Sequence, residues 1–224
     1  MLLANERPLR IGWLDRQPAA LRQAILDHAH CRRLPGGATL HLAGDPPAGI
    51  YGVIEGALAL SFPDPRSEMH LADILLPGDW AGGYSLLDQK PQRFNVEALA
   101  DTTLRVLCPI SMRRIEGRLP GSTGSFLGLA ADALRGAEQA LVDFFIPCPR
   151  RRIAATLVRC ACGRAVTLPL SQGQLAALAK VSRKRVNGTL QSFRRAGWIE
   201  LGYASVTVLD VVELAAFVDL GNAR

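Results

Sequence analysis

The chain has 224 residues, of which 49% are hydrophobic and 21% are charged, and its formal net charge at pH 7 is +6. This composition predicts a folded, globular protein with enough apolar residues for one large domain or two small ones. No run of 18 apolar residues is present and charged residues interrupt the first ten positions, which excludes a membrane span and a signal peptide, so we expect a cytoplasmic protein without membrane contact.

The first half of the chain predicts short helices followed by a β-rich domain. Residues 13–33 place apolar side chains at helical spacing and end in basic residues, which favours one or two short helices. Over residues 34–112, short apolar runs alternate with turn sequences such as LPGG (34–37) and LPGD (76–79). Because many short strands with frequent turns are typical of sandwiches and barrels, we predict an antiparallel sheet of that kind.

A proline-free segment after Gly121 predicts a long helix that ends before Pro147. Leucines recur seven residues apart, and an alanine or a phenylalanine follows each of them after three residues. This a/d pattern favours an interface between two copies of the helix, although packing within the chain's own domain is a rival explanation. The predicted dimer seam comprises Leu127, Ala130, Leu134, Ala137, Leu141 and Phe144.

The positive charge is concentrated in the last third of the chain. Residues 147–224 carry 12 Lys+Arg and 4 Asp+Glu, and residues 150–195 carry eleven basic residues and no acidic residue. Such a field raises the local concentration of any polyanion, and nucleic acid is the first candidate. A solvated charged face is the weaker alternative because it usually mixes both signs.

The basic stretch predicts two short helices joined by a tight turn. Ser171 and Gln174 have the spacing of a capping box, Ser182 can cap a second helix, and Gly197 can end it. One stripe of the second helix is apolar, and its opposite face carries the Lys, Arg, Asn and Gln side chains that read base edges in the major groove. Two strands around a turn at residues 202–204 complete a winged helix-turn-helix.

These patterns assign DNA contacts to individual residues. The predicted base-reading residues are Arg183, Lys184, Asn187 and Gln191. The predicted phosphate contacts are Ser171, Ser182, Arg185, Arg194 and Arg195, with Arg150, Arg151 and Arg152 as further sources of non-specific affinity. A basic helical domain that binds protein is the alternative, but it must explain an outer face without carboxylates.

The order of motifs along the chain resembles the cyclic-AMP receptor protein/FNR family of bacterial transcription regulators. The resemblance runs from about residue 34 to residue 212, and its segments are LHLAGDP (40–46), YGVIEGALAL (51–60), LLPGDW (75–80), LLDQKP (86–91), VEALAD (96–101) and SQGQLAALAKVSRKRV (171–186). It implies an α+β fold with an N-terminal antiparallel β-roll of the cyclic-nucleotide-binding, jelly-roll type, a long central dimerisation helix and a C-terminal winged helix-turn-helix. The corresponding domain limits are residues 1–120, 121–146 and 147–224.

The same resemblance implies the partners of the protein. It implies a homodimer that binds a near-palindromic site in double-stranded DNA, often switched by a small effector in the roll. For an activator it also implies contact with RNA polymerase. In the DNA-reading helix, Lys184 and Gly188 stand where the family has glutamate and arginine, so we expect a different half-site sequence. Lys180 occupies the turn position where glycine is usual, which strains the backbone if a positive φ is needed.

The roll departs from the family's cyclic-nucleotide site. The family's ribose-binding glutamate and phosphate-binding arginine correspond here to Gly83 and Gln92, and Arg93 lies one position along. A buried phosphate without a bidentate cation is poorly compensated, which argues against cyclic AMP in its usual pose and leaves the effector unknown. The possible effector pocket comprises Gly82, Gly83, Tyr84, Gln92 and Arg93.

No catalytic or metal-binding residue is predicted. Only His41 and His70 lie in the sheet region, without an H-x-H motif, and only Cys31 lies where FNR-type proteins have a cysteine cluster. Haem and iron–sulfur cofactors are therefore not expected, and a cupin-like metal enzyme with an accessory basic domain is the weaker alternative. An effector-independent regulator with a vestigial roll stays open.

Overall fold

The computed structural model describes residues 12–63, 69–83 and 89–219 of the chain. These residues form two compact units, and the boundary between Gly136 and Ala137 falls inside one long helix. We call the described residues up to Gly136 the N-terminal unit and those from Ala137 onward the C-terminal unit. The domain limits inferred from the sequence stay a prediction.

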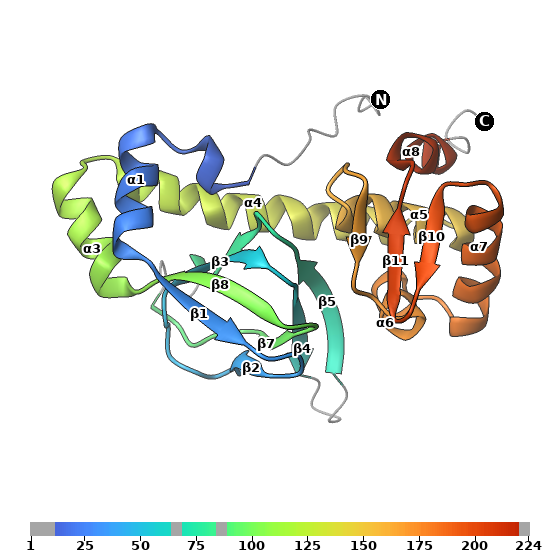
Figure 1. The fold of residues 1–224 in the computed structure, drawn as a ribbon, viewed down its shortest axis with the longest axis horizontal. Coiled ribbons are helices and arrows are strands. Elements are labelled where there is room, and N and C mark those ends of the chain that lie inside the picture. Colours follow the sequence, from blue (N-terminus) through green and yellow to red (C-terminus); the bar gives the residue numbers. More distant parts are fainter. Residues whose placement is uncertain (1–11, 64–68, 84–88, 220–224) are drawn as a thin grey trace. The chain divides into compact units, whose positions relative to one another are not determined.

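The N-terminal unit is built around an antiparallel β-roll (Figure 1). A 3-10 helix η1 (Leu14–Arg16) and helix α1 (Ala19–His28) precede it. The strands of the roll are β1 (His30–Leu34), β2 (Thr39–His41), β3 (Ile50–Glu55), β4 (Leu58–Pro63), β5 (Met69–Leu75), β6 (Trp80–Ala81), β7 (Asn95–Ala98) and β8 (Thr102–Leu107). They form two four-stranded sheets, ordered β1-β8-β3-β6 and β2-β7-β4-β5, which confirms the predicted roll.

An apolar core lies between the two sheets. Its buried members are Leu34, Tyr51, Val53, Leu58, Leu75, Val96, Ala98 and Leu104. Because side chains alternate along a strand, Tyr51 and Val53 of β3 enter this core, whereas Gly52 and Ile54 belong to the outer side of the sheet. The roll therefore has an inner and an outer face with different chemistry.

A second core packs helices onto the outer side of sheet β1-β8-β3-β6. It joins α1, α3 (Pro109–Arg118) and the start of α4 (Ser122–Phe144). The ring centroid of Trp13 lies 5.4 Å from that of Trp80 and 6.1 Å from that of Phe126, and Trp13 Nε1 donates a hydrogen bond to the main-chain oxygen of Ser125. The predicted strand region ran to residue 112, but α3 begins at Pro109 because proline suits the first turn of a helix.

The C-terminal unit holds the end of α4 and a winged helix-turn-helix (Figure 1). Its further elements are α5 (Pro149–Cys160), β9 (Val166–Leu168), α6 (Gln172–Ala179), α7 (Arg183–Arg195), β10 (Ile199–Gly202), β11 (Ser205–Val208) and α8 (Val211–Asp219). The strands form one sheet in the order β10-β11-β9, and the aromatic rings of Phe193, Trp198 and Phe217 pack against one another. Within the described part of the chain, no helix is long and apolar enough to cross a membrane.

Candidate nucleic-acid interface

Helix α6 begins at the predicted capping box. Ser171 Oγ accepts a hydrogen bond from the main-chain nitrogen of Gln174 at 3.2 Å, and Gln174 Oε1 accepts one from the main-chain nitrogen of Ser171 at 2.8 Å. After the helix, Lys180 has φ 50° and ψ 52°, which is the left-handed region. A residue other than glycine costs roughly 1–2 kcal/mol in that conformation. The positive φ that the sequence analysis named as the cause of strain at Lys180 is therefore present.

Helix α7 buries one stripe and exposes the rest. Ser182 caps it by accepting a hydrogen bond from the main-chain nitrogen of Arg185 at 3.3 Å. Val186, Leu190 and Phe193 are at most 1% exposed and pack into the C-terminal unit. This burial fixes the rotation of the helix about its axis, so the side away from the stripe faces outward, while Thr189 is buried beside Leu190.

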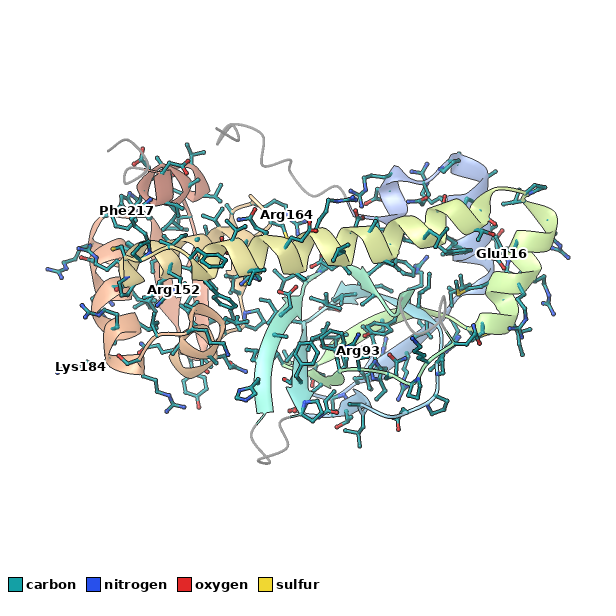
Figure 2. All side chains as sticks on the ribbon, turned by 180° about the vertical axis from the view of Figure 1, so that it is seen from behind. Arg93, Glu116, Arg152, Arg164, Lys184 and Phe217 are labelled. Atoms are coloured by element: carbon teal, nitrogen blue, oxygen red, sulfur yellow. The ribbon has the colours of Figure 1, made fainter. Side chains whose placement is uncertain are left out.

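The outward face of α7 carries most of the predicted base-reading residues. Lys184, Asn187 and Gly188 are exposed, and Gln191 is half-buried at the edge of the face. In Figure 2, Lys184 projects outward from the C-terminal unit. A β-carbon added at Gly188 would meet no atom within 4 Å, so nothing in the C-terminal unit covers this part of the helix.

Arg183 is exposed, but its guanidinium lies against helix α6. A β-carbon added at Gly173 would come within 2.8 Å of Arg183 Nη2 and 3.1 Å of Arg183 Cζ. Gly173 therefore makes room for this guanidinium over the first turn of α6, close in sequence to the predicted phosphate contact Ser171. Base reading by Arg183 requires the side chain to swing away from that position.

The predicted phosphate contacts differ in how accessible they are. Ser182, Arg185, Arg194 and Arg195 are exposed, and Arg195 Nε donates to the main-chain oxygen of Gln191 at 3.3 Å. Ser171 is half-buried, and its hydroxyl is held in the capping box. The exposed guanidinium groups therefore lie at both ends of α7.

Two of the arginines predicted to contact phosphate make hydrogen bonds inside the C-terminal unit. Arg151 Nε donates to the main-chain oxygen of Val218 at 2.7 Å. Arg152 donates to three main-chain oxygens, those of Phe144 (3.5 Å), Ile146 (3.4 Å) and Lys180 (3.2 Å). Figure 2 shows Arg152 within the unit, in contrast to Lys184. Both side chains satisfy main-chain carbonyls, which the spacing of charges along the sequence does not reveal, and their contacts with phosphate stay a prediction.

A buried ion pair joins the end of α4 to α5. Arg159 Nε lies 3.1 Å from Asp143 Oδ2, and the two side chains are 10% and 2% exposed. Gln139 Nε2 donates to the other carboxylate oxygen of Asp143 at 3.0 Å. Together with the Arg152 bonds to Phe144 and Ile146, this pair attaches the last turn of α4 to the helix that precedes the helix-turn-helix.

The predicted effector pocket is only partly described, since Tyr84 lies outside the described residues. Gly83 is buried, and a β-carbon added there would lie 3.5 Å from the side chain of Leu129 on α4. Gln92 is 7% exposed, so an amide is buried where the family places an arginine. Arg93, labelled in Figure 2, is exposed. Gly82 adopts φ 97° and packs closely against the main chain of Gly49 and Ile50.

A buried polar pair in the roll escaped the sequence analysis. His41 Nε2 lies 3.3 Å from the hydroxyl of Tyr51, with both residues on the inner side of the roll. Burial lowers the pKa of His41, although the Asp45 carboxylate opposes this, and burial raises the pKa of Tyr51, so both are neutral at pH 7. The only sequence signal for this pair is the alternation of side chains along β2 and β3, which places His41 and Tyr51 at buried positions. No cluster of three or more potential metal-ligating residues occurs among the residues described.

Two protein families match this chain. Residues 31–115 match the cyclic nucleotide-binding domain family, and residues 151–217 match the Crp-like helix-turn-helix domain family. The chain is 28% identical over 189 residues to the CRP-like cAMP-activated global transcriptional regulator of Mycobacterium tuberculosis, covering 81% of this chain and 84% of that protein. It is 27% identical over 190 residues to the cyclic AMP receptor protein of Thermus thermophilus, covering 84% of this chain and 88% of that protein.

Solved structures show the same fold. FixK2 from Bradyrhizobium japonicum aligns with a TM-score of 0.73 at 20% identity, over 84% of this chain and 96% of that chain. The catabolite activator protein of Thermus thermophilus aligns with a TM-score of 0.52 at 25% identity, over 92% of this chain and 97% of that chain. The chain therefore shares its fold with these proteins.

We predict that Asp143→Ala lowers the free energy of unfolding by about 3–5 kcal/mol, because it leaves the Arg159 guanidinium buried without that carboxylate. Asp132→Ala is the matched control on the same helix, since Asp132 pairs with Arg16 and Arg135 near the surface and its loss costs at most about 1 kcal/mol. Urea unfolding followed by circular dichroism measures both. Equal effects of the two substitutions would show that the Asp143 pair adds nothing beyond a surface contact.

Proposed function

Because the chain belongs to the cyclic-AMP receptor protein/FNR family of transcription regulators, we propose that it acts as a homodimer that reads a near-palindromic DNA site with helix α7. The chain is a CRP-like transcription regulator with a cyclic nucleotide-binding domain and a helix-turn-helix DNA-binding domain. Its curated relatives are regulators, which supports a role without catalysis. If the protein activates transcription, RNA polymerase is a further partner.

The outward face of α7 is the observation that carries the proposal. Buried Val186, Leu190 and Phe193 hold the helix in one orientation, while Lys184 and Asn187 stand exposed on the other side. An ammonium and an amide of this kind pair with the edges of guanine and adenine in a major groove. Residues 150–195 contain no acidic residue, so no carboxylate on this stretch repels the phosphates beside that groove.

The exposed seam of α4 supports dimerisation. Leu127, Leu134 and Leu141 are 50%, 54% and 57% exposed, and Phe144 is 39% exposed. Of the two alanines in the predicted seam, Ala137 is exposed and Ala130 is half-buried. Large apolar side chains at heptad spacing on one helix are covered when a second copy packs against them. A two-fold dimer then presents two copies of α7 to two half-sites, which is the reason to expect a near-palindrome.

The roll is the proposed site of any effector, and its inner face favours a ligand other than a cyclic nucleotide in the usual pose. Gln92 is buried at the position of the family's phosphate-binding arginine, and His41 and Tyr51 are neutral at pH 7 because burial shifts both pKa values away from the charged forms. A buried phosphate needs a cation or several donors that compensate its desolvation. An effector would switch the protein only through different affinities for two arrangements of the chain.

Selection of bound sequences from random duplex DNA, with purified ligand-free protein, tests the proposal directly. We expect a two-fold-symmetric motif whose half-sites lie about one helical turn apart. Recovery of a single, asymmetric motif would contradict the homodimer. If no motif emerges from ligand-free protein, the selection is repeated with cell extract, and failure there as well would refute sequence-specific binding.

Substitutions on α7 separate base reading from phosphate binding. On the selected site, Lys184→Ala and Asn187→Ala should each cost about 1–3 kcal/mol and relax discrimination at one base position, because each removes a base-edge contact. Arg194→Ala is the control, which should weaken binding to all sequences alike and reduce the salt slope by about 1. Fluorescence anisotropy at several salt concentrations measures these effects. Uniform losses from Lys184→Ala would assign that residue to phosphate instead.

A charge in the middle of the seam tests the dimer. Leu134→Glu should convert the protein to a monomer, because a carboxylate would be buried against the partner helix, and the loss of linkage should weaken DNA binding by about 10²–10⁴-fold. Arg135→Glu is the matched control, since Arg135 lies next along α4 but about 100° away around the helix, with a side chain 65% exposed. Light scattering gives the mass of each variant. A dimeric Leu134→Glu protein would place the interface elsewhere.

A further inference from the structure

A cleft lies on the outer face of sheet β1-β8-β3-β6 in the roll. Its volume is about 340 Å³. Strands β3, β6 and β8 form its floor, and η1 and α1 form its wall, so every lining residue belongs to the N-terminal unit. Its side chains include Leu14, Arg22, Leu26, Ile54, Trp80 and Arg105.

Glycine in β3 shapes this floor. A β-carbon added at Gly52 would come within 2.3 Å of the Trp80 ring, so only glycine lets the indole lie on the strand. Tyr51 and Val53, the neighbours of Gly52, are buried in the core between the sheets. The sheet thus separates the cleft from that core, and a ligand in the cleft would not occupy the interior of the roll.

Two guanidinium groups give the cleft a positive charge. Arg22 comes from α1 and Arg105 from β8, and within the described chain neither of them forms an ion pair with a carboxylate. Arg105 is half-buried and pairs along the sheet with Cys31 and Gly52, which carry no compensating charge. Asp15 is the one carboxylate among the lining residues, so the two cations exceed it. A half-buried guanidinium of this kind is well suited to bind a carboxylate.

The remaining surface of the cleft is apolar. Leu14, Leu26 and Trp80 contribute hydrocarbon and an indole ring beside the two cations. A volume of about 340 Å³ is at the lower end of the range of small-molecule sites, roughly 300–1,000 Å³. We propose that this cleft binds a small organic anion, with its carboxylate on Arg105 and Arg22 and its apolar body on Leu26 and Trp80.

The cleft is also connected to helix α4 by packed aromatic rings. Trp80 packs on Trp13, whose ring lies near that of Phe126 and whose indole nitrogen bonds to Ser125 of α4. A ligand against Trp80 therefore touches the group that anchors the start of α4. The same arrangement makes tryptophan fluorescence a direct reporter of occupancy.

Binding of octanoate to the full-length chain tests the proposal, with octan-1-ol as a neutral probe of the same length. Trp198→Phe serves as the background so that fluorescence comes from Trp13 and Trp80. We expect saturable quenching or enhancement by octanoate and at least about tenfold weaker binding of octan-1-ol, a difference of about 1.4 kcal/mol. Equal affinities, or no saturation below about 10 mM octanoate, would overturn the proposal. The outcome is independent of DNA binding and therefore of the function proposed above.

Three substitutions then locate the site. Arg105→Gln should weaken octanoate binding by at least about tenfold and leave octan-1-ol binding unchanged. Arg33→Gln, an exposed position on neighbouring strand β1, and Arg93→Gln, in the candidate effector pocket, should both leave octanoate binding unchanged. A loss with Arg93→Gln, or none with Arg105→Gln, places binding outside the cleft and refutes it. If circular dichroism shows that Arg105→Gln is unfolded, Arg22→Gln replaces it with the same expected loss.

Discussion

The buried ion pair between Asp143 and Arg159 fixes the last turn of α4 to the C-terminal unit. Its carboxylate also accepts from Gln139, and Arg152 adds bonds from α5 to the carbonyl oxygens of Phe144 and Ile146. Breaking a buried ion pair leaves an uncompensated charge, so separating this turn from α5 would strongly destabilise the folded protein. The end of the proposed dimer seam is therefore held against α5 of the C-terminal unit.

Arg152 extends the same network to the turn of the helix-turn-helix. Its guanidinium reaches the carbonyl oxygen of Lys180, the residue in the left-handed conformation between α6 and α7. Along the sequence Arg151 and Arg152 look like part of a DNA-binding charge cluster, yet both are directed at main-chain oxygens within the unit. The exposed cations of the basic stretch therefore lie mainly on α7, with Arg150 and Lys180 as exposed cations outside it.

The sequence predicts the C-terminal half well, because its signals are local. Capping serines, a helical apolar stripe and a glycine stop depend on neighbours a few residues away. Ser171 and Ser182 cap their helices and Val186 is buried, as predicted. Strand β9 lacks such a signal, whereas α3 and α8 have local signals that the sequence analysis did not use: Pro109 in the first turn of α3, and Asp210, whose carboxylate accepts a hydrogen bond from the main-chain nitrogen of Glu213 at 2.9 Å. The His41–Tyr51 pair, the internal arginines and the outer cleft depend on contacts between distant strands and helices, which no spacing along the chain encodes.

Gly188 lies on the face of α7 that we propose reads DNA, and this position is free to change during evolution. A β-carbon at this position meets nothing, so the C-terminal unit places no steric limit on what stands there. Any ordinary residue would also favour the helix relative to glycine, by up to about 1 kcal/mol for alanine. New side chains can thus be accommodated at the centre of this face without loss of stability, and on the proposed reading mode a single substitution here would be enough to change the preferred operator sequence.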